Sequence, residues 1–323
     1  MILITGATGL LGSFVAKQLL TNGYKVKCIV RPNADRKLLQ SFTDQINWVE
    51  GDIMDISFLR ENLQDIDSIV HCAAIISFVP SQQTLMFNTN VVGTANMVNA
   101  ALEAGVEQFI HVSSIAALGR KEGISQIDEH IKWEESPNNS GYARSKYLAE
   151  LEVWRGSEEG LNVSIVNPSI ILGAGDVARS STKLFDYVRQ GNSFYTDGNI
   201  NYVDVRDVAT AIATLVKEPH EAQQFILNGG TISYKNFFEK IAHQLHQKPP
   251  HRKATKWMLA IGWRMAAVYS FFTKKEPTLT KETAKISDSN YVYIAKKSEE
   301  VLGMKYTNFN DTVAWTCTTL WGK

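Results

Sequence analysis

Tyr142 and Lys146 form the best candidate pair for acid–base chemistry in this sequence. The Tyr-x-x-x-Lys spacing alone is weak evidence, because Tyr293 and Lys297 repeat it. The first pair, however, opens a helical pattern over residues 141–159, where a separation of four places both side chains on one face. An ammonium group beside a phenol lowers the phenol pKa from its usual value of about 10, which suits proton transfer near neutral pH.

Ser114 completes a candidate trio. It comes just after an apolar run at Gln108–Val112 that is typical of a buried strand. Hydride attack on a carbonyl builds negative charge on the oxygen, which must then receive a proton. Tyr142 would donate that proton, and the Ser114 hydroxyl would hold the oxygen by a hydrogen bond. The alternative is a tyrosine and a lysine on a helix surface that carry no chemistry.

A glycine-rich loop follows the first predicted strand. The run TGATGLLG at residues 5–12 repeats glycine every third residue and leads directly into an amphipathic helical pattern. Such glycines permit a tight turn, close approach of a pyrophosphate and close helix–strand packing, while the helix N-terminus attracts phosphate. The context predicts a dinucleotide site rather than a turn without a ligand. Its predicted contacts are Gly6, Thr8, Gly9, Leu10, Leu11 and Gly12.

The end of the second predicted strand indicates which dinucleotide is preferred. A carboxylate at that point would bind both ribose hydroxyls of NAD, whereas this sequence has Arg31 followed by proline. Arginine can hold a 2′-phosphate in a bidentate manner, so NADP(H) is favoured over NAD(H). Asp52 is predicted to bond the adenine amine, with Ile53 packed beside the ring. Arg31 could instead be a solvated strand end.

Elements that position these residues follow a strand–helix alternation. Strands are predicted at 1–4, 25–30, 46–50, 68–72, 108–112 and 163–167, and helices at 10–22, 56–62, 84–104 and 141–159. This rhythm predicts an α/β fold with a doubly wound parallel sheet of the Rossmann type. The expected division is a dinucleotide-binding domain at 1–167, with return segments near 202–216 and 224–228, and a smaller substrate lobe over 168–323.

The sequence resembles the extended short-chain dehydrogenases/reductases, and within them the dihydroflavonol reductase and 3β-hydroxysteroid dehydrogenase branch. The motifs that carry the resemblance extend over residues 1 to about 230. They are TGATGLLG at 5–12, HCAA at 71–74, NVVGT at 90–94, VSS at 112–114, YARSK at 142–146, NPSIILG at 167–173 and YVDVRDVA at 202–209.

The resemblance implies several roles that the residues alone do not. Ser114, Tyr142 and Lys146 would be the catalytic residues, and Lys146 would also bond the nicotinamide ribose. Asn90 would tie a helix to a strand beside the cofactor. Asn167 stands where many relatives have arginine, so the pattern assigns it no role. Further cofactor contacts implied by the resemblance are Ala73, Ala74, Pro168, Ser169 and Ile170.

Three functions compete once this fold is granted. The first is NADPH-dependent reduction of an aldehyde or ketone, with a related 3β-hydroxysteroid dehydrogenase activity as an alternative. The second is a nucleotide-sugar epimerase or dehydratase with NAD, which would favour an acid at Arg31 and Thr-Asp-Glu near Ser114 instead of Ser-Ser-Ile-Ala. The third is a sensor that holds NADP without turnover, which the intact trio argues against.

Apolar residues near the expected strand ends predict a pocket for an apolar or aromatic carbonyl substrate. The candidates are Phe78, Val79, Leu118, Tyr195, Met265 and Tyr269. The last two lie in the apolar segment Lys256–Thr273, whose central Arg264 argues against a membrane span. A cover over a ligand or partner surface is favoured for this segment, with peripheral membrane contact as an alternative. The helices at 84–104 and 141–159 could form a homodimer interface.

Composition excludes several classes of partner and site. Lys plus Arg and Asp plus Glu number 33 each, so no net charge favours binding to nucleic acid. The three cysteines are far apart and predict buried thiols in a reducing compartment, and the first strand leaves no room for a signal peptide. These observations predict a cytoplasmic protein. His243 and His246 lack further ligands, so no metal site is expected.

Overall fold

A seven-stranded parallel sheet forms the centre of the molecule in the computed structural model, which describes residues 1–120, 123–177, 181–273, 277 and 279–322. Its strand order is β11-β7-β5-β4-β1-β2-β3. The order places β1 and β5, which lead to the glycine loop and to Ser114, on either side of β4. The strands are β1 (Ile2–Thr5), β2 (Val26–Val30), β3 (Ile46–Glu50), β4 (Ser68–His71), β5 (Gln108–Val112), β7 (Val163–Pro168) and β11 (Gln223–Leu227).

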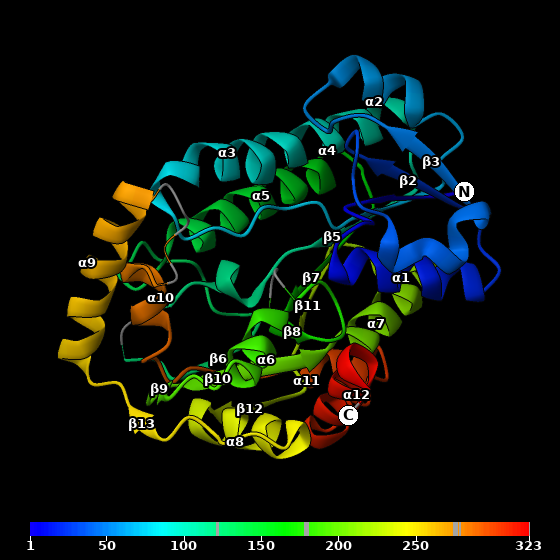
Figure 1. The fold of residues 1–323 in the computed structure, drawn as a ribbon. Helices are drawn as coiled ribbons and strands as arrows, with labels where there is room; N and C mark the ends of the chain where they lie inside the picture. The colour runs from blue at the N-terminus through cyan, green and yellow to red at the C-terminus, as the bar shows by residue number, and fades with distance from the viewer. Residues whose placement is uncertain (121–122, 178–180, 274–276, 278, 323) are drawn as a thin grey trace.

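Helices cover both faces of this sheet (Figure 1). On one face α1 (Leu10–Thr21) packs against α7 (Val205–Lys217), and their apolar sides meet β1, β2 and β5 in one hydrophobic core. On the other face α2 (Ile56–Asn62), α4 (Gly93–Ala104) and α5 (Gly141–Glu158) enclose a second core. A 3₁₀ segment at Lys37–Gln45 joins β2 to β3. The predicted α/β fold is confirmed.

The long helix predicted at 84–104 is broken into parts. A 3₁₀ turn at Pro80–Gln82 leads into α3 (Gln83–Phe87), and a π-helical turn at Asn88–Val92 separates α3 from α4. Asn90 lies inside this turn. Its amide accepts a hydrogen bond from the Ile75 backbone N–H (2.8 Å) and donates to the Ile75 carbonyl (2.9 Å) and to Ser145 Oγ (2.9 Å). These bonds tie three segments together, as the resemblance implies for Asn90.

A second lobe lies beside the carboxyl end of the main sheet. Its three-stranded sheet has the order β12-β10-β8 and packs against α6, α8 and α12 around a core rich in phenylalanine. The segment predicted to return to the main sheet near 202–216 instead divides: its strand joins this small sheet, and its helix is α7 on the main sheet. The elements are β8 (Ile170–Leu172), β10 (Asn199–Asp204), β12 (Gly230–Ser233), α6 (Thr182–Arg189), α8 (Tyr234–Leu245) and α12 (Phe309–Trp321).

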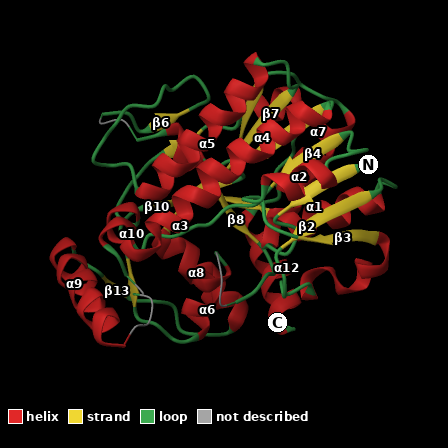
Figure 2. Cartoon of the chain, turned by 90° about the horizontal axis from the view of Figure 1, so that it is seen from above, coloured by secondary structure: helices red, strands yellow, loops and turns green. Residues whose placement is uncertain are grey.

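Short elements complete the chain. β9 (Phe194–Tyr195) pairs with β13 (Arg252–Lys253), and β6 (Gln126–Ile127) pairs with β14 (Val292–Tyr293). A 3₁₀ turn at Ile115–Leu118 follows β5, and the remaining helices are α9 (Lys256–Thr273), α10 (Lys281–Ile286) and α11 (Lys296–Val301). Helix α9 lies at the outer edge of the molecule beside α10 (Figure 2). Among the described residues, no helix has the length and apolar character to cross a membrane.

Candidate active site

Ser114 and Tyr142 meet beyond the carboxyl end of β5. Helix α5 begins at a fixed point because the Ser140 side chain accepts a hydrogen bond from the Ala143 N–H at 3.0 Å. Tyr142 therefore lies in the first turn, where its phenol is close enough to the Ser114 hydroxyl for that group to affect the phenol pKa. Phe78 contributes an edge contact, with its ring centroid 5.9 Å from that of Tyr142. The structure thus brings two predicted catalytic residues and one predicted substrate residue together.

Lys146 lies one helical turn beyond Tyr142 and is buried. Its Nζ donates to the Val112 carbonyl oxygen at 2.9 Å and lies 3.4 Å from His111 Nε2. Burial lowers the pKa of Lys146 to about 8, an effect that the charge of Glu150 opposes. Sequence reasoning predicts a lowered Tyr142 pKa, whereas burial raises it to about 12, an effect that the nearby Ser114 hydroxyl opposes.

Two histidine side chains lie beside the Lys146 ammonium. His71 and His111 end β4 and β5, and their rings stack with centroids 5.5 Å apart. The two nitrogens of His71 are each within hydrogen-bonding distance of a threonine hydroxyl, Thr5 at 2.7 Å and Thr94 at 3.1 Å. Burial, reinforced by the Lys146 charge, lowers the pKa of His71 to about 3 and that of His111 well below its ordinary value. Both rings are therefore neutral packing groups.

The glycine loop has the close contacts that a phosphate cradle requires. Gly6 has φ of 71°, and a Cβ there would lie 2.8 Å from the Ala73 backbone nitrogen. A Cβ at Gly12 would lie 2.3 Å from the Gly6 carbonyl oxygen, so neither position can hold a larger residue without backbone movement. Helix α1 starts from Gly9 with no side-chain cap, which leaves its first N–H groups open to an anion. The residues present fit a pyrophosphate.

The NPSIILG segment lies against the same loop. A Cβ at Gly175 would meet the Leu10 side chain at 3.0 Å, so the turn after β8 packs on the start of α1. Pro168 and Ser169 are buried between β7 and β8, and the Ser169 N–H donates to the Leu227 carbonyl at 2.9 Å. The buried Ser169 hydroxyl has no hydrogen-bond partner among the described residues. An unpartnered buried hydroxyl at this edge fits a polar group of a bound cofactor.

Two arginines follow β2, and of these only Arg36 forms an ion pair among the described residues. Arg31 is exposed and opens a turn in which Asn33 adopts φ of 59°. Arg36 instead bonds Glu50 at 2.6 Å, and its guanidinium lies 4.8 Å from the Trp48 ring centroid. Sequence reasoning missed Glu50, because it ends β3 and lies beside the end of β2 only through the β2–β3 pairing of Val30 with Glu50.

Other predicted contacts are distributed around the same edge. Ile53 is buried against the start of α4, where a Cβ at Gly93 would lie 2.6 Å from its Cδ1. Asp52 is exposed and accepts a hydrogen bond from the Met54 N–H at 3.0 Å. The remaining predicted cofactor contacts are Thr8 in the glycine loop, Leu11 on the first turn of α1, Ala74 after β4 and Ile170 at the start of β8.

The predicted substrate residues divide into two groups. Phe78 contacts Tyr142, Val79 immediately precedes the 3₁₀ turn at Pro80–Gln82, and Leu118 is buried in the turn after Ser114. Tyr195 lies on β9 in the second lobe. Met265 and Tyr269 lie on α9 with 67% and 59% of their surface exposed. For all six residues a role in a substrate pocket remains a prediction.

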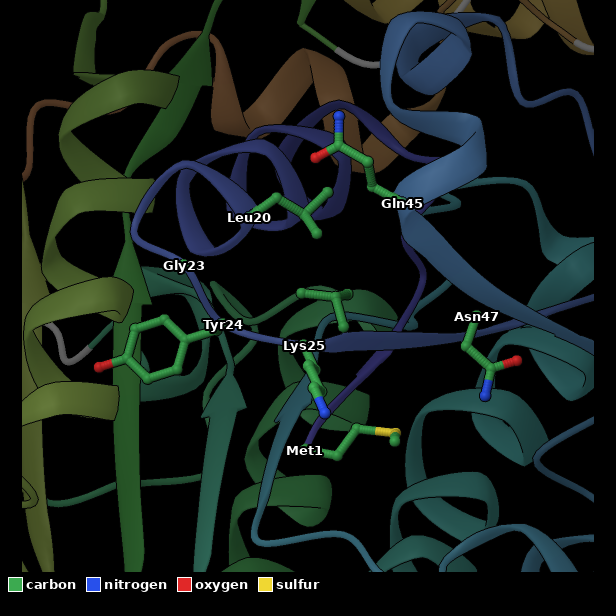
Figure 3. A pocket seen from close by; sticks show the side chains of 8 residues that line it. Met1, Leu20, Gly23, Tyr24, Lys25, Gln45 and Asn47 are labelled. Atoms are coloured by element: carbon green, nitrogen blue, oxygen red, sulfur yellow. The ribbon is translucent and has the colours of Figure 1, made fainter.

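A cavity of about 410 Å³ lies at the opposite edge of the sheet, lined by residues that include Met1, Lys25 and Asn47 (Figure 3). It is formed at the amino-terminal ends of β1, β2 and β3, whereas ligands of doubly wound sheets bind at the carboxyl ends. A second cavity of about 290 Å³ adjoins Gly141 and Arg144 at the start of α5. Among the described residues no cluster of His, Cys, Asp and Glu could hold a metal ion.

Comparison with known proteins agrees with this geometry. The profile of the "NAD dependent epimerase/dehydratase family" matches residues 2–230. The chain belongs to that family. Among relatives of this epimerase/dehydratase chain, a Synechocystis protein named for dihydroflavonol 4-reductase is 27% identical over 96% of this chain and 92% of its own length. Sterol demethylase protein B of Methylococcus capsulatus is 28% identical over 97% of each chain.

A solved structure shares the fold over nearly the whole chain. The crystal structure of gox2253 superposes with a TM-score of 0.83 at 30% sequence identity, covering 98% of this chain and 97% of that one. The names of the two relatives of this chain given above assign members of the epimerase/dehydratase family to oxidation–reduction chemistry. This chain is therefore an NAD(P)-dependent oxidoreductase, as the motifs predict.

Proposed function

We propose that this oxidoreductase uses NADPH to reduce the aldehyde or ketone group of an apolar or aromatic substrate. One observation carries the proposal. The Ser114 hydroxyl and the Tyr142 phenol lie close to each other at the carboxyl edge of the sheet, where Gly6 packs tightly against Ala73 in a loop that fits a pyrophosphate. A carbonyl oxygen placed between the two hydroxyls would meet two donors, which is the arrangement that its reduction needs.

In the proposed reduction each of several side chains has a separate role. NADPH would supply the hydride when bound to the glycine loop, with Arg31 on its 2′-phosphate and Lys146 on its nicotinamide ribose. Ser114 orients the carbonyl oxygen. Tyr142 donates the phenolic proton to that oxygen as negative charge develops there. Lys146 supplies positive charge that favours the resulting phenolate. Solvent then returns a proton to the phenolate, so that one hydride and one proton reach the substrate.

Cofactor preference is tested by fluorescence titration with NADPH and NADH, comparing the wild type with Arg31→Ala. We expect NADPH to bind more tightly and the variant to lose that preference. If NADH binds as well as NADPH, the Glu50 carboxylate beside the end of β2 governs the site. The alternatives, a 3β-hydroxysteroid dehydrogenase or a nucleotide-sugar epimerase, would then be favoured.

Turnover is tested by NADPH oxidation with dihydroquercetin, cinnamaldehyde and a 3-ketosteroid. Tyr142→Phe should lower kcat by roughly 10²- to 10⁴-fold, as expected for loss of a general acid, without loss of NADPH binding. Tyr147→Phe is the matched control, because Tyr147 is on the same helix but its ring stacks on that of Trp133, with the ring centroids 4.5 Å apart. Binding of NADPH without turnover of any probe would support the sensor alternative.

A further inference from the structure

A connected set of hydrogen bonds lies behind Lys146 and Ser114. Glu150 is one turn beyond Lys146 on α5 and is only 4% exposed. Asn167, at the end of β7, is fully buried, and its Nδ2 donates to Glu150 Oε1 at 2.6 Å and to the Ser114 carbonyl oxygen at 2.9 Å. Gln224 on β11 donates its Nε2 to Glu150 Oε2 at 3.1 Å and to Asn167 Oδ1 at 2.9 Å.

This bonding fixes the direction in which the Asn167 amide faces. Its Oδ1 accepts from Gln224, so its Nδ2 must point to Glu150 and to the Ser114 carbonyl, as an amide has distinct donor and acceptor ends. The Ser114 backbone is thereby tethered to the carboxylate through a single side chain. Because Ser114 also caps the following 3₁₀ turn, moving Asn167 would move the hydroxyl that faces Tyr142.

Glu150 also faces the charge of Lys146. The titratable groups that interact with that ammonium are His71 and His111 from the two strand ends, Cys72 after β4, and Glu150. The histidines are neutral, and burial raises the Cys72 pKa to about 12, so the thiol is protonated. Burial raises the pKa of Glu150, while the hydrogen bonds from Asn167 and Gln224 and the charge of Lys146 act against this rise. Among these neighbours Glu150 is the group that can supply a counter-charge. A buried ammonium without one is costly, so Glu150 favours the charged form.

We propose that Glu150 is a positioning residue for the reaction. Held by Asn167 and Gln224, its carboxylate fixes the Ser114 backbone on one side and faces the Lys146 ammonium on the other. The inference rests on the proposed function, since it acts through Ser114 and Lys146. It adds three residues to the Ser114, Tyr142 and Lys146 trio. They are Glu150 from α5, Asn167 from β7 and Gln224 from β11.

The first test compares Glu150→Gln, Glu150→Asp and the wild type in NADPH oxidation, using whichever of the three carbonyl probes turns over fastest. In the Gln variant kcat should fall by roughly 10- to 100-fold while the KM for NADPH changes little, because the misplaced group is Ser114. The alkaline limb of the pH profile should move to lower pH. The Asp variant, which keeps the charge, should restore the limb. Glu152→Gln is the control, since Glu152 pairs with Arg155 near the surface.

A second test needs neither substrate nor cofactor. Because the folded pKa of Lys146 lies below its unfolded value, the unfolding free energy of the wild type should rise relative to Lys146→Met from about pH 8 to about pH 10.5. Urea unfolding of the apo-protein measures this difference. Repeating the pair in the Glu150→Gln background should move the onset to lower pH, because the counter-charge is gone. An unchanged onset would overturn the electrostatic role.

A third variant covers failure of Glu150→Gln to fold. Gln224 is half-buried at the sheet edge, and Gln224→Ala removes the bond that orients the Asn167 amide. It should lower kcat several-fold with an unchanged melting temperature. Unchanged kcat, or a loss of activity in Glu150→Gln that follows stability alone with no shift of the pH profile, would overturn the proposal. If Tyr142→Phe is as active as the wild type, the proposed function itself fails instead.

Discussion

At the scale of single residues, the site shifts the pKa values of its two central groups, Tyr142 and Lys146, in opposite directions. Burial raises the Tyr142 pKa to about 12 and lowers the Lys146 pKa to about 8. The phenol therefore stays protonated through the whole neutral range and is available as a donor for reduction. The ammonium is the group that loses its proton first as pH rises, so it sets the alkaline limit of the activity.

This order predicts the pH dependence of reduction. The rate should fall as pH rises through about 8, because Lys146 becomes neutral there while Tyr142 does not. Lys146→Arg should move the limb upward by a unit or more, at reduced kcat, because arginine remains charged. The measurement is kcat against pH from 5.5 to 10, with Lys17→Arg on α1 as control. A limb at the same pH in both proteins would assign it to another group.

Residue-scale prediction succeeds where the contact is local. Tyr142 and Lys146 are four apart on one helix, so their shared face follows from spacing alone. Glu150 has the same spacing from Lys146, and an acid on a buried helix face was a usable signal. Asn167 and Gln224 join it from two strands, and only the pairing of β7 with β11 brings them together. No sequence pattern encodes that distance.

At the scale of elements, the glycine loop separates a packing role from a ligand role. A Cβ at Gly12 would lie 2.3 Å from the Gly6 carbonyl oxygen, whereas one at Gly9 would lie 3.3 Å from it. Gly12→Ala should therefore destabilise the fold by a few kcal/mol, within the usual range for overpacking of about 1–3 kcal/mol. Gly9→Ala should keep the melting temperature within a few degrees but weaken NADPH binding at least tenfold.

Thermal unfolding and NADPH titration of the two variants check this prediction. Each of the two glycine variants serves as the control for the other. Ala7 in the same loop cannot serve, because it is already a buried alanine. Equal loss of stability in both variants would mean that the whole loop is needed for packing. Unchanged NADPH binding in Gly9→Ala would mean that the phosphates do not approach that backbone.

Helix α9 shows how an element can be predicted while its environment is not. Its apolar length is evident in the sequence, but the side that faces outward is fixed by its packing on α10. An apolar stripe on α9 is exposed, consisting of Trp257, Ile261, Met265, Val268 and Phe272. The helix contains no acidic residue and carries Arg264 beside the stripe. These features fit an interfacial helix that binds an anionic membrane surface.

We therefore expect the protein to co-sediment with vesicles that contain phosphatidylserine at low salt. The double substitution Ile261→Asp with Met265→Asp should abolish co-sedimentation and leave the melting temperature unchanged, because both side chains are exposed. Val301→Asp, another exposed apolar position, on α11, is the control. Wild-type protein that remains in the supernatant would leave the stripe to a protein partner or to cover over a ligand.

At the scale of the whole molecule, the two lobes are joined by bonds that no local pattern predicts. The Gly141 N–H at the start of α5 donates to Glu282 on α10 at 3.2 Å, and Asp207 on α7 accepts from the Thr307 N–H at 2.7 Å. The first bond ties the helix that carries Tyr142 to the second lobe. The alternation of strands and helices predicted the sheet, because each βαβ unit is local. The lobe contacts join residues about 100 or more apart and depend on the finished fold.

The outer face of α3, the π-helical turn and α5 supports one further prediction for the whole molecule. Its exposed apolar side chains are Leu85, Phe87, Val92 and Leu151. Neighbouring exposed groups of this size on adjacent helices are typical of protein interfaces. We expect two copies to pack through this face, which includes parts of both helices that the sequence analysis names for a homodimer interface, with twice the chain mass of 36.1 kDa in light scattering.

The double substitution Leu85→Arg with Leu151→Arg should convert the dimer to a monomer, because two like charges would face each other across a twofold axis. The variant should melt below the wild type only because it lacks the stabilisation that dimerisation adds. The difference between the two melting temperatures should therefore become smaller when both proteins are diluted. The Ile261→Asp with Met265→Asp variant of α9 should stay dimeric, which separates the two exposed apolar surfaces. A wild-type mass of 36.1 kDa at tens of micromolar would contradict the interface, and a dimer abolished only by the α9 variant would place it on that helix instead.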